Sequence, residues 1–512
     1  MKVKINENAV SEELNRANSI EGFYANTGIL VTGATGFLGK GILEKLMRVC
    51  PSIASIFILI RPKKNQTIEQ RFKKLIDDPI YESIKAIHPS VVNKVHPVEG
   101  DVSLSDLGLS VADRNILIEN VNIVFHVAAT VRFNEPLNVA VNVNTKSTAR
   151  IMELCKELKH VISIVYVSTA YSNANIFEIE EKIYTTSFKP STVINICESG
   201  DQQSIDLLED EILKIYPNTY TFSKNLAEQI MSNNSDSLPV AIVRPSVIGA
   251  SLKEPCPGWV DNIYGLTGIF MLIGKGTTRT MLVKKSKRLD LVPVDYVVNI
   301  IICAAWHVTL HRNNEVKVYN STSNAHPIKW NQIRDIVVQC SRETPMNNVI
   351  WFPFCILVPN QCSYNVLDIF LHILPAFFMD IFLKLSGRKP MIMKTSKLFN
   401  QMVRAVKFFG QHEWTFHQDN VTDMIKRVNL LKDRDIVKLD LWDMDWKKYM
   451  ITYMAGIEKF ILREDSKSID AAQKRLLFLY RIHQIVLMFS LFILLATIYI
   501  IYSTLTVRLF FP

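Results

Sequence analysis

The sequence predicts an α/β fold built on a doubly wound parallel sheet, with a smaller, mainly helical C-terminal domain and one C-terminal transmembrane helix. Three observations predict it. Short apolar runs rich in β-branched residues alternate with helical patterns over roughly the first 250 residues, as in βαβ units. Five glycines crowd into residues 28–41. Near the other end, residues 485–502 form an uncharged and almost wholly apolar stretch.

The bulk composition excludes several classes of protein. Apolar residues make up 48% and charged residues 21% of the 512-residue chain, which excludes whole-chain disorder. The net charge is mildly basic at +9 and the basic residues are scattered, so no nucleic-acid partner is expected. The eight cysteines form no CxxC pair, which favours free thiols in a reducing compartment. The polar start of the chain lacks the apolar core of a cleaved signal peptide.

The apolar runs give the predicted strands in order. They cover residues 28–32, 55–60, 121–127, 162–167 and 240–243. A helical pattern from Phe37 to Val49 lies between the first two runs. Residues 1–20 are polar with a helical pattern, and the acidic stretch 195–210 is predicted to be an exposed insertion.

The glycine cluster follows the first predicted strand and opens the first helix, which is the setting of a Rossmann dinucleotide-binding turn. Gly33 permits the tight turn, Gly36 lets the backbone approach a pyrophosphate, and Gly39 lets the helix pack closely on the strand. The pyrophosphate is expected at the helix N-terminus, where amide groups favour anions. A purely structural turn is the alternative. The cofactor contacts expected from this segment are Thr32, Gly33, Thr35, Gly36, Phe37, Leu38 and Gly39.

The end of the second predicted strand indicates which dinucleotide binds. NAD sites place a carboxylate here for the ribose 2′-hydroxyl. This chain instead has Arg61, Lys63 and Lys64, which would attract a 2′-phosphate, so NADPH is the predicted cofactor. A solvated charge run is the alternative. Four further residues follow other predicted strands. Asp101 and Val102 are placed to meet the adenine, and Ala128 and Ala129 to line the cofactor without steric bulk.

Tyr220 and Lys224 form the candidate catalytic pair. They are four residues apart and therefore share one face of a helix. An ammonium beside a phenol lowers the phenol pKa, which makes the tyrosine a usable proton donor near neutral pH. Ser168 and Thr169 end the preceding strand, where a hydroxyl can bond the reacting carbonyl. Asn144, with Asn142, is placed to anchor a water or a backbone carbonyl behind the lysine. A surface pair is the alternative for Tyr220 and Lys224.

Longer strings of sequence carry a family resemblance. They include TGATGFLGK, LIRPKK, VSTAYSNA, YPNTYTFSKNLAE and IVRPSVIGAS, and later HILPAFFMD and KPMIMK. Together they resemble the extended short-chain dehydrogenase/reductase superfamily and, within it, the eukaryotic, insect-type fatty acyl-CoA reductases. The resemblance implies reduction of a long or very long chain acyl-CoA to a primary alcohol with two NADPH.

The resemblance also assigns residue roles. Tyr220 is implied as the general acid and Lys224 as its pKa partner and ribose ligand. Thr169, with Ser168 close by, would polarise the carbonyl, and the nicotinamide would lie near Pro245 and Val247. Three alternatives stay open: a reductase of another hydrophobic carbonyl such as a sterol, a reductase that stops at the aldehyde, and an inactive membrane-tethered binding protein.

The resemblance completes the predicted domain organisation. It consists of a polar N-terminal segment over 1–26, an NADPH-binding reductase domain with a substrate-binding part over 27–345, a C-terminal acyl-CoA reductase domain over 346–465, and a transmembrane helix over 484–504. Residues 349–385 are apolar but broken by prolines and charges, which favours a packed lid or an interfacial amphipathic helix over a span. This region is the candidate tunnel that retains the aldehyde. The basic run 284–288 is a candidate contact for CoA phosphates, or a solvated charge run.

The apolar stretch 485–502 predicts a single membrane anchor. Its 18 residues would span roughly 27 Å as a helix, close to the hydrocarbon thickness of about 30 Å. Lys474, Arg475 and Arg481 precede it and only Arg508 follows, so the catalytic body is expected in the cytosol. A buried core helix is the alternative. The endoplasmic reticulum is the first choice of membrane and the peroxisome the second. Long-chain acyl-CoA and the bilayer are the expected partners, with a homodimer possible.

Overall fold

The computed structural model describes residues 18–235, 238–311, 315–463 and 469–510. Most of the helix expected within residues 1–20 lies outside the described residues. The chain forms two compact units. The first, here the sheet unit, comprises Met1–Asn262, Arg288–Ile328 and Glu413–Asp445. The second, here the helical unit, comprises Ile263–Lys287, Lys329–His412 and Trp446–Pro512. The two units therefore interleave along the chain, whereas the sequence suggested a boundary at 345/346.

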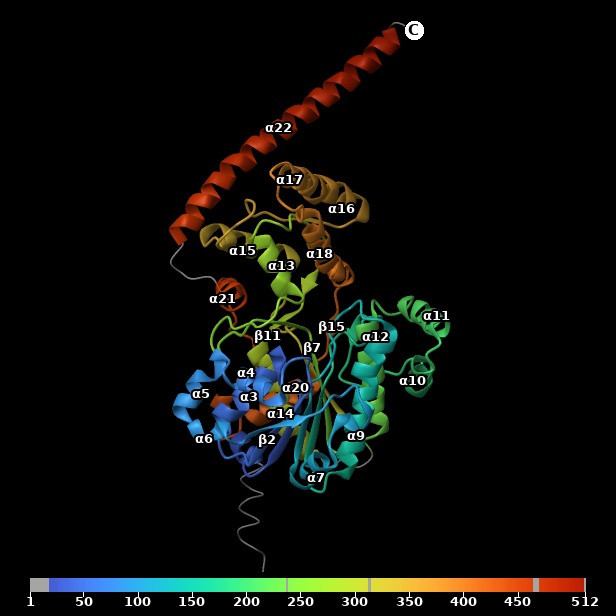
Figure 1. Ribbon diagram of the computed structural model, residues 1–512, viewed down its shortest axis with the longest axis vertical. Helices are drawn as coiled ribbons and strands as arrows, with labels where there is room; N and C mark the ends of the chain where they lie inside the picture. The colour runs from blue at the N-terminus through green and yellow to red at the C-terminus, as the bar shows by residue number, and fades with distance from the viewer. Residues whose placement is uncertain (1–17, 236–237, 312–314, 464–468, 511–512) are drawn as a thin grey trace, which may run out of the picture. The chain divides into compact units, whose positions relative to one another are not determined.

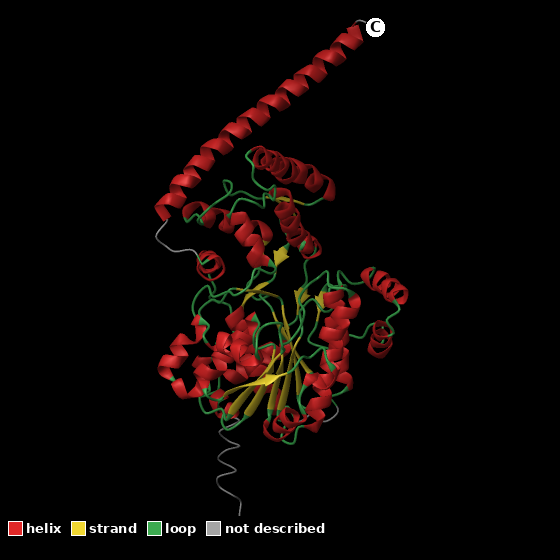
Figure 2. Cartoon of the chain, in the orientation of Figure 1, coloured by secondary structure: helices red, strands yellow, loops and turns green. Residues whose placement is uncertain are grey.

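A seven-stranded sheet forms the centre of the sheet unit, with strand order β12-β7-β5-β4-β1-β2-β3 (Figure 2). Its strands are β1 (Gly28–Thr32), β2 (Ser55–Ile60), β3 (Val95–Glu99), β4 (Ile123–His126), β5 (Ser163–Val167), β7 (Val240–Pro245) and β12 (Lys317–Ser321). Every neighbouring pair is parallel. The five predicted strands are confirmed. The order reverses between β1 and β4, and ligands bind at such a switch point in open α/β sheets.

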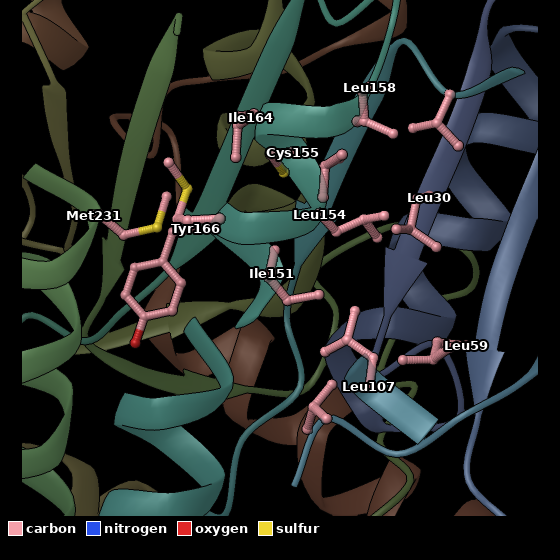
Figure 3. Packing of buried hydrophobic residues seen from close by; sticks show 14 of the residues in the cluster. Leu30, Leu59, Leu107, Ile151, Leu154, Cys155, Leu158, Ile164, Tyr166 and Met231 are labelled. Carbon is pink, nitrogen blue, oxygen red and sulfur yellow. The ribbon is translucent and has the colours of Figure 1, made fainter. Parts of the chain in front are cut away.

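Helices cover both faces of this sheet, as Figures 1 and 2 show. Successive strand residues point to opposite faces. On one face, Leu30 and Ile164 of the strands pack with Ile151 of α9 (Ser147–Glu157) and Met231 of α12 (Thr219–Asn233), as Figure 3 shows. On the other face α14 (Val294–His307) contacts β5, β7 and the glycine-led helix α3 (Phe37–Val49). The doubly wound α/β prediction is therefore confirmed, and so are the bounds of α3.

The sheet unit contains further helices, helical turns and short strands. Its helices are α2 (Ile20–Tyr24), α4 (Ile68–Ile76), α5 (Glu82–Ile87), α6 (Pro89–Val92), α7 (Val111–Asn120), α8 (Leu137–Ala140), α10 (Pro190–Glu198), α11 (Gln202–Leu213) and α20 (Asp419–Val428). Single helical turns are η1 (Pro79–Tyr81), η2 (Ser105–Gly108), η3 (Val141–Lys146), η4 (Val308–Leu310) and η6 (Arg434–Ile436). Short strands are β6 (Glu178–Ile179), β8 (Val247–Gly249), β10 (Arg288–Leu289), β11 (Leu291–Pro293), β13 (Ile328–Lys329, at the unit boundary) and β15 (Thr415–Phe416).

Two of these elements refine the sequence picture. The acidic stretch 195–210 falls largely in α10 and α11, which bury Val193 and Ile205 against Phe222 of α12. The stretch is therefore largely exposed, as the sequence predicted, and its helices pack on α12 through a few inward apolar residues. Residues 413–445 return to the sheet unit because β15 pairs with β6 and α20 packs on β12 and α14.

The helical unit contains the other elements. Its helices are α13 (Leu266–Gly274), α15 (Trp330–Glu343), α16 (Gln361–Asp368), α17 (Leu374–Leu385), α18 (Ile392–Ala405), α19 (Lys407–Gln411), α21 (Trp446–Gly456) and α22 (Ile469–Phe510), with η5 (Ile369–Ile373) and η7 (Ile457–Leu462). β9 (Thr280–Leu282) and β14 (Ile356–Val358) form a parallel pair.

Among the described residues, two helical stretches are long and apolar enough to cross a membrane, Gln361–Leu385 and Asp470–Thr504. The second lies in α22, has no buried residue in its most apolar part, and contains the predicted 484–504 segment.

Candidate active site

The glycine turn joins β1 to α3 and has the geometry of a pyrophosphate site. Gly33 has a positive φ of 73°, and a Cβ there would lie 2.8 Å from the Ala128 nitrogen. A Cβ on Gly39 would lie 2.2 Å from the Gly33 carbonyl oxygen, so only glycine lets α3 pack this closely. At Gly36 a Cβ would meet only the Gly33 oxygen, at 3.3 Å, which leaves the N-terminus of α3 open to an anion. The residues present therefore fit a dinucleotide.

Thr32 has a structural task beside this turn. Its Oγ1 accepts hydrogen bonds from the backbone nitrogens of Val127 (3.1 Å) and Ala128 (3.2 Å) and lies 2.9 Å from His126 Nδ1. Burial lowers the pKa of His126 to about 3, with a smaller effect of the Lys224 charge, so the imidazole is neutral. The Thr32 hydroxyl therefore fixes the Ala128 segment against β1 and is fully buried, which leaves no side chain for the cofactor.

The cations after β2 lie exposed. Within the described residues no ion pair involves Arg61, Lys63 or Lys64. Arg71 of α4 donates to the Arg61 carbonyl, and burial and the Arg61 charge both lower its pKa. Arg71 therefore belongs to this cluster of cations, although the sequence analysis did not include it. Its position in the helix that follows the basic run could have indicated it. An exposed, unpaired group of cations fits a phosphate better than a ribose hydroxyl.

Asp101 and Val102 lie at the end of β3. The Asp101 carboxylate accepts hydrogen bonds from the Ser103 nitrogen (2.9 Å) and hydroxyl (2.7 Å). The Val102 carbonyl accepts a 3.0 Å bond from Arg150. Both residues are thus held in a fixed loop at the carboxyl edge of the sheet.

Tyr220 lies in the first turn of α12, which Asn218 caps by accepting a 2.9 Å hydrogen bond from the Thr221 nitrogen. Its ring stacks on Phe133 with centroids 5.8 Å apart. Burial raises the pKa of Tyr220 to about 12, and a hydrogen bond with Thr169 opposes that rise. The phenol is therefore protonated at neutral pH and lies beside the predicted partner hydroxyl.

Lys224 is buried one turn further along α12. Its Nζ donates to the Val167 carbonyl at 2.8 Å and lies 4.7 Å from the centre of the Tyr166 ring. Burial lowers its pKa to about 7, with Glu228 acting in the opposite direction. The expectation that Lys224 lowers the Tyr220 pKa is wrong for this structure, because the ammonium turns toward β5 and burial dominates the phenol.

The structure separates Ser168 from Thr169. Thr169 Oγ1 donates to the Pro245 carbonyl at 3.4 Å and is the hydroxyl near Tyr220. Ser168 Oγ instead donates to Glu228 Oε1 at 2.5 Å. Because this hydroxyl is buried on a carboxylate, Thr169 is the better candidate for bonding a substrate oxygen.

A buried ion pair behind these residues was missed by sequence reasoning. Arg244 and Glu228 are fully buried and form two bonds, Nη2–Oε2 at 2.6 Å and Nε–Oε1 at 2.9 Å. Ser172 also donates to Glu228, at 3.0 Å. Arg244 immediately precedes Pro245, so the pair ties the ends of β5 and β7 to α12. An arginine within the apolar run VAIVRP was the available signal.

Asn144 connects two loops of the site. Its Oδ1 accepts from the Thr130 nitrogen at 2.9 Å, and its Nδ2 donates to the Thr130 carbonyl (3.1 Å) and to Ser223 Oγ (3.0 Å). Asn142 instead bonds Arg150 and the Ser103 carbonyl. Both asparagines therefore fix the site's loops, and Asn144 reaches α12 through Ser223 rather than through Lys224.

The carboxyl ends of four neighbouring strands bring these parts to one edge of the sheet. β1 leads into the glycine turn, β4 into the Ala128–Ala129 segment, β5 into Thr169, and β7 ends at Pro245. Val247 opens β8 and is half-buried at the same edge. This edge can hold a dinucleotide beside a protonated tyrosine, the arrangement needed for hydride transfer to a carbonyl.

Comparison with known proteins agrees with this chemistry. Residues 31–301 and 371–464 match two segments of a family described as male sterility protein. Fatty acyl-CoA reductase 1 of Rattus norvegicus is 35% identical over 459 residues, which cover 90% of this chain and 89% of that protein. This chain belongs to the fatty acyl-CoA reductase family. Fatty acyl-CoA reductase 2 of Homo sapiens is 34% identical, and the match covers 91% of this chain and 90% of that protein. Fatty acyl-CoA reductase wat of Drosophila melanogaster is 33% identical, and the match covers 88% of this chain and 87% of that protein.

Solved structures agree with the fold. The reductase domain of a nonribosomal peptide synthetase from Mycobacterium tuberculosis has a TM-score of 0.58 at 17% identity, covering 90% of this chain and 96% of its own. The terminal R domain of the myxalamid pathway has a TM-score of 0.56 at 19% identity, covering 89% and 98%. At these identities the likeness shows a shared architecture alone.

Proposed function

We propose that this protein reduces long or very long chain fatty acyl-CoA to a primary fatty alcohol and CoA through a bound aldehyde. Family membership over about nine-tenths of the chain supports the substrate class. The observation that carries the chemistry is a buried, protonated Tyr220 beside Thr169, at the edge of the sheet where the glycine turn lies. Each alcohol would require two successive hydride transfers.

We propose NADPH as the reductant, which supplies the hydride when bound. The turn from Gly33 to Gly39 would receive its pyrophosphate, and Arg61, Lys63 and Arg71 its 2′-phosphate. Asp101 and Val102 would meet the adenine. Ala128 and Ala129, small residues held by Thr32 and Asn144, would border the dinucleotide, and Pro245 and Val247 would lie near the nicotinamide.

The chain's own residues would act on the substrate oxygen. Thr169 would donate a hydrogen bond to the carbonyl and Tyr220 would donate the proton that neutralises the developing oxyanion. Reduction needs the protonated phenol, and the raised pKa of Tyr220 maintains that form. Lys224, with a pKa of about 7, can return a proton to the site near neutral pH. The same residues would serve the second reduction, of the aldehyde.

The remaining expectations concern location and partners. We propose that α22 anchors the protein in a membrane with the catalytic body in the cytosol, because basic residues precede its apolar part. The endoplasmic reticulum stays the first choice and the peroxisome the second. Retention of the aldehyde by residues 349–385, CoA contacts by the basic run 284–288, and homodimer formation stay predictions.

Expression in yeast followed by lipid extraction and gas chromatography tests the proposed function. We expect long-chain primary alcohols that are absent from cells carrying Tyr220→Phe. Accumulation of aldehyde alone would show that the second reduction does not occur. A conversion of added sterol ketones without fatty alcohol would replace the proposal with reduction of another hydrophobic carbonyl.

A further inference from the structure

The helical stretch Gln361–Leu385 comprises α16, η5 and α17 (Figure 1). It buries polar residues and exposes apolar ones, the reverse of an ordinary surface helix. Its buried residues are Tyr364, Asp368, His372 and Ala376, spaced four apart along one side. Three of these four are polar. A helix on a soluble protein normally turns its apolar side toward the protein and its polar side toward water.

The inner side of the stretch is held by hydrogen bonds to other residues of the helical unit. The backbone nitrogen of Arg279 donates to His372 Nε2 at 2.9 Å, so His372 Nδ1 carries a proton and donates to Asp368 at 2.8 Å. Asn400 of α18 also donates to Asp368, at 3.0 Å. Asp380 accepts from the backbone nitrogen of Ile392 at 2.8 Å. These bonds fix which side of the stretch faces outward.

The outward side is apolar and bare in the part of the chain that the structure describes. Phe370, Phe378 and Phe382 are each 63–64% exposed, and Leu385 is 83% exposed. Ile369 and Phe377 lie beside them. We call these six residues the outer apolar face. Exposed apolar patches of this kind mark contact with another apolar phase.

Basic residues follow the outer apolar face along the chain, at the end of α17 and in the first turns of α18. Lys384, Arg388, Lys389, Lys394 and Lys397 are all exposed, and among the described residues none forms an ion pair. Apolar side chains bordered by unpaired lysine and arginine are typical of helices in the interface of anionic membranes, where the cations meet lipid phosphates.

We propose that the outer apolar face lies in the interface of a membrane containing anionic lipids, as a second membrane contact in addition to α22. A spanning arrangement would carry Asp368 and His372 into hydrocarbon and break their bonds to α18 and to Arg279, which is costly. The interfacial arrangement keeps those bonds and covers only the side that is bare. The apolar helix α22, proposed above as the membrane anchor, belongs to the same helical unit.

A depth-sensitive fluorescent probe tests this proposal in the full chain. Phe378→Cys is labelled in a Cys362→Ser background, because Cys362 is the exposed cysteine among the described residues. The protein is reconstituted in phosphatidylcholine vesicles with phosphatidylserine and with lipids carrying a nitroxide near either the headgroup or the bilayer centre. We expect blue-shifted emission and roughly twofold stronger quenching by the shallow nitroxide. Leu207→Cys on α11, 61% exposed, is the matched control and should remain unquenched.

The other outcomes overturn the proposal. Stronger quenching by the deep nitroxide would mean that the stretch spans the bilayer. Blue-shifted emission without quenching would mean that protein, such as a second copy of the chain, covers the face. Water-like emission would mean that the face is bare. If the Phe378 variant does not fold, Phe382→Cys gives the same reading. Lys394→Gln with Lys397→Gln should reduce quenching only in vesicles that contain phosphatidylserine.

Discussion

Helix α12 of the sheet unit and the stretch Gln361–Leu385 of the helical unit both turn polar residues inward at four-residue spacing. In α12 these are Lys224 and Glu228, and in the other stretch Asp368 and His372. The difference lies in what covers the outside. α12 is packed by α9, α10 and α11, and nearly all of its residues are buried. The outer apolar face has no such cover among the described residues. An inward polar row therefore lies beside the proposed catalytic tyrosine in one place and leaves an apolar surface exposed in the other.

The largest effect is expected at Tyr220, in the first turn of α12. Tyr220→Phe removes the proposed proton donor while keeping the ring against Phe133, and we expect kcat to fall by about 10²–10⁴-fold. The reaction is followed by NADPH oxidation with a long-chain acyl-CoA.

Tyr216→Phe is the matched control, because this buried tyrosine precedes α12 and packs against Phe222, outside the proposed chemistry. We expect its kcat to stay near that of the unaltered protein. Equal losses in both variants would show that the phenol of Tyr220 has no special role.

The buried ion pair of Arg244 and Glu228 should stabilise the fold more than an exposed ion pair does. Glu228→Gln leaves the Arg244 charge uncompensated, and we expect the free energy of unfolding to drop by about 3–5 kcal/mol. Denaturant unfolding in detergent measures this change.

The exposed ion pair of Arg114 and Glu157 is the control for the buried ion pair. Its shortest N–O distance is 2.7 Å, similar to the buried pair. Because water screens it, Glu157→Gln should cost less than about 1 kcal/mol. A similar loss in both variants would contradict the assigned role of burial.

The cation cluster should set cofactor preference without affecting the fold. Replacing Arg61 and Lys63 together by serine is expected to raise the KM for NADPH roughly tenfold, about 1.4 kcal/mol, and to leave the KM for NADH nearly unchanged. Steady-state kinetics with both cofactors measure the ratio. Lys73→Ser with Lys74→Ser on α4 is the control, since these exposed lysines follow the cluster on the next helix. An equal rise in the KM for NADH would contradict the assignment of these cations to the 2′-phosphate.

A pH dependence is expected from Lys224. Its ammonium is present below a pKa of about 7, so kcat/KM should decline above that pH by up to tenfold per unit. Lys224→Arg should remove this decline. In the unfolded chain the lysine has the ordinary pKa of 10.5. The unfolded state therefore binds more protons between pH 7 and 10.5, and stability should rise with pH across that window. A flat kcat/KM profile from pH 6 to 9 would contradict the assigned role of the ammonium.

The backbone of the site was predictable from the sequence because strands, glycines and turns are set by local patterns. β1, α3 and the Gly33–Gly36–Gly39 turn lie where the sequence placed them. The direction of each side chain was not predictable, because it depends on partners distant in sequence. Ser168 turns to Glu228, 60 residues away, and Lys224 turns to Val167, 57 residues away.

The same reason limits the prediction of organisation. Residues 413–445 return to the sheet unit through pairings such as β15 with β6, whose partners are more than 200 residues apart. The apolar character of 349–385 was visible in the sequence, but its inward polar row depends on bonds to Arg279 and Asn400. Sequence alone therefore left a packed lid and an interfacial helix equally open.

The stoichiometry of the reaction tests the central claim most directly. The full-length protein in detergent or vesicles is given stearoyl-CoA and NADPH, and NADPH oxidised, CoA released and alcohol formed are measured together. Alcohol-forming reduction predicts two NADPH oxidised for each CoA released and each alcohol formed, with Tyr220→Phe slow in both steps. One NADPH per CoA with aldehyde as the final product, or no CoA release at all, would contradict it.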